Sequence, residues 1–113
     1  MERLNFNCKM WLERDGQKVF GDGPCDILLR VERTGSLRQA AADINMSYSQ
    51  AWRLIRTLEK ELGCPLLLKK AGGERGGGSE LTEQAGELIK RYQSFSNAAQ
   101  AALQEIFHEH FTK

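Results

Sequence analysis

The fold of this chain is decided by residues 34–70, TGSLRQAAADINMSYSQAWRLIRTLEKELGCPLLLKK. Two S-x-x-Q patterns lie eleven residues apart in this stretch, Ser36 to Gln39 and Ser47 to Gln50, and an apolar run with helical spacing follows each. In a capping box, the serine oxygen accepts a hydrogen bond from the backbone N–H three residues later, and the Gln side chain reaches back to the serine N–H. The stretch therefore predicts two short helices in tandem.

The segment between these helix starts suits a close helix crossing. Ala40, Ala41 and Ala42 have small side chains, and Ile44 and Met46 supply apolar contacts at the turn. These features predict a helix-turn-helix, a motif whose second helix can enter the major groove of DNA.

The second predicted helix has an apolar stripe and a polar face. The stripe, which should face the core, comprises Ala51, Leu54, Ile55, Leu58 and Leu62. The polar face comprises Tyr48, Ser49, Gln50, Arg53, Arg56 and Thr57. Arg binds guanine or phosphate, Gln binds adenine and hydroxyls bind either, so this composition fits contacts with base edges and phosphates.

This stretch also resembles a known family. GSLRQAAADINMSYSQAWRLIRTLEKELGCPLL is similar to the N-terminal winged helix of LysR-type regulators, with paired alanines, a Ser-led second helix, then LE and ELGxPLL. The resemblance is closer to molybdate-responsive regulators of the ModE type, through MSYSQAW, the glycine-rich AGGERGGGSELT and the N-terminal WLERDGQKVFGDG, and it covers roughly residues 10 to 92. ModE-type proteins usually continue into C-terminal molybdate-binding domains. Such domains would only begin where this sequence ends, so we expect no molybdate site in it.

Composition fits one cytoplasmic domain over residues 1–113. The 41% hydrophobic content supplies enough apolar material for one core. No run of eighteen apolar residues occurs, which excludes a membrane-spanning segment, and the first residues carry charges where a signal peptide needs an apolar stretch.

The net charge is only +1, but it is unevenly distributed. Residues Ser47 to Arg75 include six basic and three acidic side chains, whereas Glu80 to Phe111 include two basic and five acidic ones. The predicted recognition unit is therefore the basic part of the chain, which favours a position against phosphate.

Neither the cysteines nor the histidines form a catalytic or metal-binding pattern. Cys8, Cys25 and Cys64 are odd in number and widely separated, which favours small buried thiols over disulfides or a C-x-x-C metal pair. His108 and His110 fall on different sides of a helix, unlike the i, i+4 pair of a helical zinc site. We expect no catalysis, no metal and no cofactor.

The N-terminal residues predict a hairpin and then a helix. Apolar residues alternate from Leu4 to Leu12, Asp15-Gly16 favours a tight turn, and Gln17 to Phe20 can return as the second strand of a hairpin within residues 1–21. A first helix of about Asp26 to Arg33 should follow. It would end at Thr34-Gly35 and complete a helix-turn-helix core over residues 24–63.

A glycine-rich hairpin, or wing, is predicted over residues 64–82. Cys64-Pro65 ends the second motif helix, Leu66 to Leu68 predict a short buried strand, and Glu80 to Thr82 a return strand. The AGGERGGGS stretch between them has five glycines in nine residues. A basic hairpin directly after a recognition helix is typical of a wing, and a disordered linker is the alternative.

The last segment, residues 82–111, predicts a long dimerisation helix. Apolar residues recur at steps of four and three over nearly four heptads, in a seam that also includes Ala102 and is widened by Ile89 and Ser96. One small domain covers only the first turns of such a helix, so a second copy should cover the rest; packing back on its own domain is the alternative. The predicted interface comprises Leu81, Ala85, Leu88, Tyr92, Phe95, Ala99, Leu103 and Ile106.

These elements predict a mainly α fold with small β structure: a winged helix-turn-helix with an N-terminal β-hairpin and a long C-terminal dimerisation helix. The predicted function is sequence-specific binding of double-stranded DNA by a homodimer, on a pseudo-palindromic site, to regulate transcription. The alternative is a protein-interaction module that uses the winged helix as a scaffold and its long acidic helix to recruit a partner.

The predicted DNA contacts divide by role. Base edges would be approached by Ser47, Tyr48, Ser49, Gln50 and Arg53. Phosphates would be held by Ser36, Arg38, Gln39 and Arg56, and the wing would be placed along the DNA by Lys69, Lys70 and Arg75. Trp52 lies one position from the apolar stripe, so we expect it to pack rather than to read bases.

Overall fold

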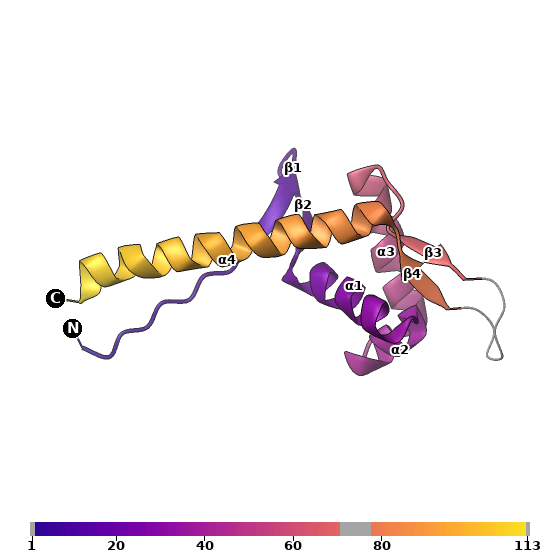
Figure 1. Cartoon of the computed structure of the whole chain (residues 1–113), viewed down its shortest axis with the longest axis horizontal. Coiled ribbons are helices and arrows are strands. Elements are labelled where there is room, and N and C mark those ends of the chain that lie inside the picture. Colours follow the sequence, from indigo (N-terminus) through magenta and orange to yellow (C-terminus); the bar gives the residue numbers. More distant parts are fainter. Residues whose placement is uncertain (1, 71–77, 113) are drawn as a thin grey trace.

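The computed structural model describes residues 2–70 and 78–112, which fold into four helices and two small antiparallel hairpins (Figure 1). The first hairpin and the motif helices are β1 (Trp11–Arg14), β2 (Gln17–Gly21), α1 (Asp22–Thr34), α2 (Leu37–Asp43) and α3 (Tyr48–Leu62). The second hairpin and the last helix are β3 (Leu67–Lys69), β4 (Ser79–Leu81) and α4 (Glu83–Phe111). The predicted mainly helical fold with small hairpins is confirmed.

The core lies between α1, α2, α3 and the first half of α4. Its largest fully buried side chains include Ile27 and Leu28 from α1, Ile55 from α3 and Phe20 from β2. The ring of Phe20 meets that of Tyr92 edge-on, with centroids 5.2 Å apart. Because each large apolar side chain contributes about 1.5–3 kcal/mol when buried, this core fixes α3 relative to the other helices.

Serine caps both motif helices, but only one capping box is complete. Ser47 Oγ accepts from the Gln50 backbone N–H at 3.1 Å, and Gln50 Oε1 accepts from the Ser47 N–H at 3.0 Å. Ser36 Oγ likewise accepts from the Gln39 N–H at 3.0 Å, but the Gln39 amide donates to Asp43 at 2.8 Å instead of accepting from Ser36. The predicted box at Ser36 is therefore wrong in its second half, because an acceptor one turn further on competes for the Gln39 side chain.

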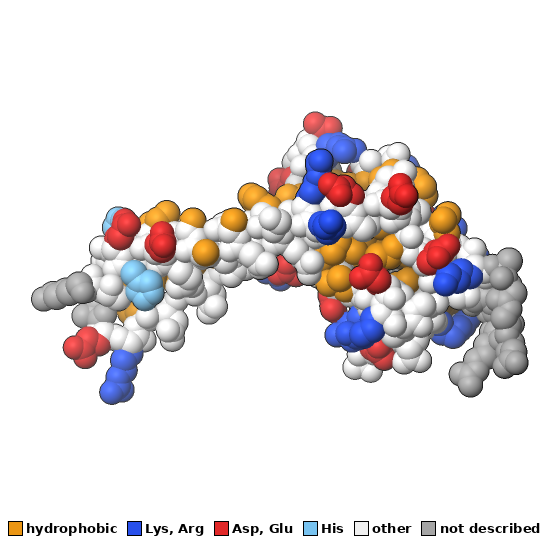
Figure 2. All heavy atoms as spheres, in the orientation of Figure 1, with side chains coloured by type: hydrophobic (Ala, Val, Ile, Leu, Met, Phe, Trp, Pro, Cys, Tyr) orange, Lys and Arg blue, Asp and Glu red, His pale blue; other side chains and the backbone are white. Residues whose placement is uncertain are grey.

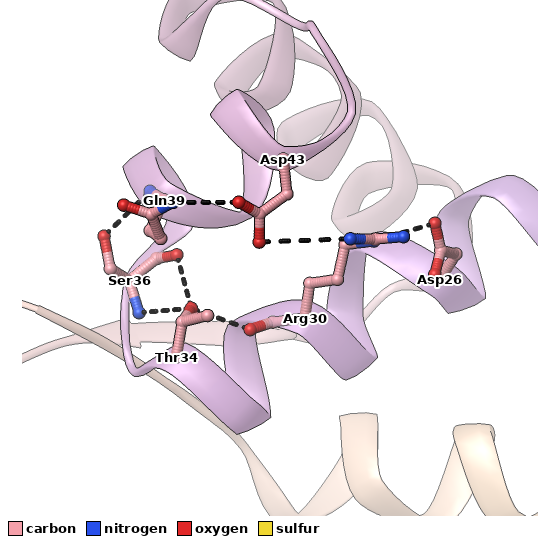
Figure 3. A network of polar contacts seen from close by, with 6 residues as sticks. All are labelled: Asp26, Arg30, Thr34, Ser36, Gln39 and Asp43. Atoms are coloured by element: carbon pink, nitrogen blue, oxygen red, sulfur yellow. Dashed lines mark hydrogen bonds and ion pairs between the residues drawn. The ribbon is translucent and has the colours of Figure 1, made fainter.

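The turn between α1 and α2 is held by a polar network (Figure 3). Arg30 of α1 donates to Asp26 at 3.0 Å and lies 3.9 Å from Asp43 of α2. The Thr34 hydroxyl donates to the Arg30 carbonyl at 2.7 Å and accepts from the Ser36 N–H at 3.3 Å. Each partly exposed ion pair stabilises by less than about 1 kcal/mol, but together these contacts define the crossing of the two helices.

The N-terminal elements differ from the prediction at their boundaries. Strand β1 begins at Trp11, opposite Gly21, instead of at Leu4. Residues before Trp11 find no strand to pair with, because β2 ends where α1 begins at Asp22. Helix α1 also starts four residues earlier than expected, since Pro24 lies in its first turn, where the missing proline N–H is not needed.

Helix α4 packs on the core with its first half and then projects from it along the 60 Å long axis of the molecule (Figure 1). Its buried positions are Ala85, Ile89, Tyr92 and Ser96. Tyr92, a member of the predicted dimer interface, is only 3% exposed, so its side chain packs within its own chain and is not available to a second copy. Leu81 lies in β4 and not in the helix. Ala85 and Tyr92 of the predicted seam are buried, whereas Phe95 and Ile106 are exposed.

The projecting part of α4 runs beside the N-terminal segment (Figure 1). Phe6 stacks on Phe107 with ring centroids 5.8 Å apart, and Gln104 donates to the Phe6 carbonyl at 3.4 Å. The alternative of packing within the same chain therefore applies to part of the helix. Phe95 and Ile106 stay about half exposed, at 53% and 49%.

The cysteines lie in three different environments. Cys25 is buried and Cys64 partly buried, but Cys8 is exposed, so the expectation of buried thiols is wrong for Cys8. Burial raises the pKa of the Cys25 thiol. Within residues 2–70 and 78–112, no three His, Cys, Asp or Glu side chains gather as a metal ion requires, and no helix is long and apolar enough to cross a membrane.

Candidate nucleic-acid interface

The exposed face of α3 carries two parallel columns of side chains, because residues four apart stack along one side of a helix. We call Tyr48–Trp52–Arg56 the aromatic column and Ser49–Arg53–Thr57 the polar column. Both columns line one shallow depression on the protein surface, together with Lys69 of β3.

The opposite face of α3 explains why these columns point outward. Ala51, Ile55 and Leu58 are buried, and Leu54 and Leu62 are partly buried against the core. This arrangement confirms the predicted inward stripe. The helix cannot rotate to hide its polar face without exposing these side chains.

Cations from three elements gather on the two rings of the aromatic column. The guanidinium carbon of Arg56 lies 4.6 Å from the ring centroid of Trp52, and the Lys69 Nζ lies 5.2 Å from the same centroid. Tyr48 meets Trp52 edge-on at 6.1 Å, and the guanidinium carbon of Arg38, from α2, lies 4.2 Å from the Tyr48 centroid. The aromatic column thus joins α2, α3 and β3 into one positively charged surface.

Trp52 has a larger role in this surface than the sequence indicated. It is partly buried and packs against the core, as expected. Its ring also lines the depression and has two cations beside it. The available signal was its spacing of four residues from both Tyr48 and Arg56.

Glu59 attaches the second hairpin to α3. Its Oε2 accepts hydrogen bonds from the backbone N–H groups of Leu66, at 2.8 Å, and Leu67, at 3.3 Å, while its Oε1 pairs with Arg56 at 3.0 Å. One carboxylate therefore fixes the start of β3 and orients a cation of the aromatic column. Lys69 follows two residues after Leu67 and is brought over Trp52 by this connection.

Some of the predicted contact residues lie together in the depression, whereas others have side-chain atoms that are hydrogen-bonded within the protein. Tyr48, Ser49, Arg53, Arg56 and Lys69 share the depression. The Ser47 hydroxyl oxygen and the Gln50 side-chain oxygen are used in the capping box, which leaves the Gln50 Nε2 to donate elsewhere.

Two other groups of predicted contacts lie outside the depression. Ser36 and Gln39 are engaged at the start of α2. Lys70 lies 3.8 Å from Glu80 in an exposed ion pair across the hairpin, which reduces its net charge effect. Arg75 lies outside the described residues.

A comparison with protein families identifies the motif. The model of the bacterial regulatory helix-turn-helix proteins of the lysR family matches residues 25–86. This range contains most of α1, all of α2 and α3, both strands of the second hairpin and the start of α4.

Curated relatives with similar sequences include two ModE proteins. The molybdenum transport protein ModE of Azotobacter vinelandii is 31% identical over 106 residues, which are 94% of this chain and 39% of that protein. The DNA-binding transcriptional dual regulator ModE of Escherichia coli K12 is 32% identical over 87 residues, 76% of this chain and 33% of that protein. The chain thus spans between a third and two fifths of the length of these relatives.

Solved structures with the same fold include two that contain DNA. The CbnR DNA-binding domain in its DNA complex matches with a TM-score of 0.56 and 21% identity, over 76% of this chain and 93% of that one. Vibrio fischeri DarR in complex with DNA matches with a TM-score of 0.53 and 21% identity, over 76% of this chain and 28% of that one. At this identity, the structures establish the fold alone. Because the family model matches more than half of its residues, the chain belongs to the lysR family of bacterial regulatory helix-turn-helix proteins, which are transcription regulators and not enzymes.

Proposed function

We propose that this protein is a sequence-specific regulator that binds double-stranded DNA in the cytoplasm as a homodimer, on a pseudo-palindromic site. The observation that carries the proposal is the exposed face of α3, where Arg53, Arg56 and Lys69 line one depression with hydroxyl and aromatic side chains. Arg, Lys, Ser and Thr are the side chains that contact phosphates and base edges in a major groove.

The proposed contacts follow the position of each residue. The N-terminal turns of a recognition helix approach base edges, which assigns base contacts to Ser49 and Arg53, beside Ser47, Tyr48 and Gln50. Phosphates would be contacted by Ser36, Arg38, Gln39 and Arg56, and by Lys69, Lys70 and Arg75 of the wing. Arg56 suits phosphate better than bases, because Glu59 and the Trp52 ring hold it in place.

The proposed dimer uses the exposed side of α4. One recognition helix reads few base pairs, and a two-fold dimer doubles the readout. Figure 2 shows hydrophobic side chains spaced along the projecting part of this helix. Phe95, on the exposed side of the first half, and Ile106, on the projecting part, are each about half exposed, so covering each contributes about 0.8–1.5 kcal/mol, half of the value for full burial. A second copy of the chain would supply that cover.

The names of several relatives refer to molybdenum, but we propose that residues 1–113 do not themselves bind molybdate. The family match lies in the helix-turn-helix, and the similarity extends over only 39% of the Azotobacter vinelandii ModE. Calorimetry should show no saturable heat when molybdate is added at micromolar concentration; a saturable signal would contradict this part of the proposal.

The competing hypothesis is a protein-interaction module. It gives no reason for basic side chains from different elements to gather in one surface depression. Arg53 and Lys69 come from different elements and line the same depression, which favours DNA. The test is a fluorescence anisotropy titration of the purified protein against a duplex chosen by selection and against a random duplex at one fixed salt concentration. The proposal expects about 10³-fold or greater preference for the selected duplex, and equal affinity would refute sequence-specific binding.

A further inference from the structure

The rings of Tyr48 and Trp52 are placed where they could contact bases, yet each already has a cation against it. Arg38 lies over Tyr48, and both Arg56 and Lys69 lie over Trp52. The three cations come from α2, α3 and β3, so the rings connect charges that the chain supplies from separate places.

Such contacts change how a long basic side chain binds phosphate. A free Lys or Arg loses up to about 2 kcal/mol of side-chain entropy when it becomes ordered, and a cation over an exposed aromatic ring is held with about 0.5–1 kcal/mol. A side chain that rests on a ring before DNA arrives therefore has less freedom to lose on binding. Arg56 has a second restraint in Glu59, at 3.0 Å.

We infer that Tyr48 and Trp52 are positioning residues, which hold Arg38, Arg56 and Lys69 in line for the DNA phosphates. The polar column would then read the sequence, mainly through Arg53. This inference rests on the proposed DNA binding and refines it, because it moves Tyr48 from base reading to phosphate placement and gives Trp52 a function beyond packing.

The decisive variant is Trp52→Leu, which keeps an apolar side chain against the core and removes the ring. Loss of two ring–cation contacts should weaken binding about five- to thirty-fold, by the same factor for selected and random duplexes, and should reduce the log-log salt slope by up to about 2. Trp52→Phe keeps an aromatic face and should restore most of the affinity. Trp11→Leu is the matched control, because Lys18 lies 5.5 Å over that ring on the first hairpin and neither residue lines the depression.

A double-variant cycle separates positioning from a structural effect. In the wild type, Lys69→Met should weaken binding, whereas in the Trp52→Leu background the same change should have a clearly smaller effect. Lys18→Met should have no effect in either background. If Trp52→Leu unfolds the domain, the same cycle between Tyr48→Leu and Arg38→Met tests the inference at the other ring.

Three results would overturn the inference. The first is strict additivity in the cycle, and the second is a fall in the preference for the selected duplex when Trp52 is replaced. The third is a contact of the Trp52 ring with a thymine methyl group. In that case, replacing thymine by uracil in the site would weaken DNA binding by the wild type but not by Trp52→Leu, and the ring would read a base. Failure of the proposed function looks different, because the wild-type protein itself would then not prefer any duplex.

Discussion

Arg53 and Arg56 lie three residues apart on α3, but the structure gives them different surroundings. Arg56 is held by Glu59 and by the Trp52 ring, so its guanidinium can bind a phosphate at a defined position. Arg53 belongs to the polar column between two hydroxyl side chains, where a guanidinium can adjust to a base edge. The two arginines should therefore respond differently to substitution.

Replacing Arg53 by Ala should weaken binding to the preferred site by about 1–3 kcal/mol, because a bidentate contact with a base is lost. Binding to random DNA should change much less, so selectivity falls. Competition titrations with both duplexes measure the difference, and Arg91→Ala, on α4, controls for loss of one positive charge. An equal loss on both duplexes would make Arg53 a phosphate contact.

Tyr92 shows how a buried hydroxyl joins distant segments. It donates to the Asp22 carboxylate at 2.6 Å and lies 3.2 Å from the Met10 carbonyl oxygen. Burial, together with the hydrogen bond to Asp22, raises the pKa of Tyr92 to about 12. Tyr92→Phe should lower the free energy of unfolding by about 1–2 kcal/mol, measured by urea denaturation.

The same shift predicts a pH dependence. Below pH 10 the Tyr92 hydroxyl is protonated in both the folded and the unfolded chain, so its stabilisation is complete. Between pH 10 and 12 the unfolded chain ionises first, and the stabilisation is lost as the pH rises. The stability difference between wild type and Tyr92→Phe should therefore shrink across this range. A constant difference would show that the hydroxyl is not shielded in this way.

Some single-residue roles could be predicted from sequence and others could not. The cap at Ser47 depends only on residues within one helical turn, so the S-x-x-Q pattern was sufficient to predict it. The Gln39 side chain had two partners within reach, and only the structure shows that it chooses Asp43. The contact of Lys69 with Trp52 depends on a strand that begins fifteen residues later, a distance over which spacing carries no information.

At the scale of elements, the second hairpin is the part that extends the recognition surface beyond α3. Its start is fixed by Glu59, and Thr82 at its end donates to the Pro65 carbonyl at 2.7 Å. Both anchors lie on the core side of the hairpin. The strand therefore carries Lys69 at a defined place beside α3.

Replacing Lys69, Lys70 and Arg75 by Ala should weaken binding to all duplexes with little change in sequence preference. Each lost phosphate contact should reduce the log-log salt slope by about 1. Lys70 should contribute least at low salt, because Glu80 lies 3.8 Å away. Unchanged affinity of the triple variant at low salt would remove this hairpin from the interface.

Element boundaries could be predicted where local signals end a helix and not where neighbours decide. Gly35 adopts the left-handed conformation that closes α1, as predicted. Gly63 does the same for α3, directly before the Cys64-Pro65 pair that was expected to end this helix. The alternating residues from Leu4 to Met10 fit a strand equally well in sequence. They form none because the chain turns into α1 before it can offer them a partner.

At the scale of the whole molecule, the first half of α4 packs on the core and its second half projects from it. Phe95 is exposed on the first half of the helix and Ile106 on the projecting half, and the N-terminal segment covers only part of the projecting half. Replacing both residues by Glu should produce a monomer that keeps its helical content and its unfolding transition but loses most specific DNA binding. Sedimentation equilibrium at tens of micromolar compares it with Ser94→Glu/Gln100→Glu, which adds the same charge on the same helix.

Two outcomes would contradict this interface. One is a wild-type protein that sediments as a monomer at tens of micromolar. The other is a Phe95→Glu/Ile106→Glu variant that still dimerises. In the second case, Leu88 and Leu103, which are partly buried, would be insufficiently exposed to hold a dimer through α4, so the two copies would have to contact each other elsewhere.

If α3 reads DNA sequence in a two-fold dimer, the purified protein should select a defined sequence from a pool of random duplexes. We expect it to enrich an inverted repeat whose half-sites lie about one helical turn, 10–10.5 base pairs, or a multiple of that, apart. Under the same conditions, Arg53→Ala should enrich a more degenerate half-site at the same spacing. Recovery of no common sequence, or of the same sequence with unchanged information content by Arg53→Ala, would contradict it.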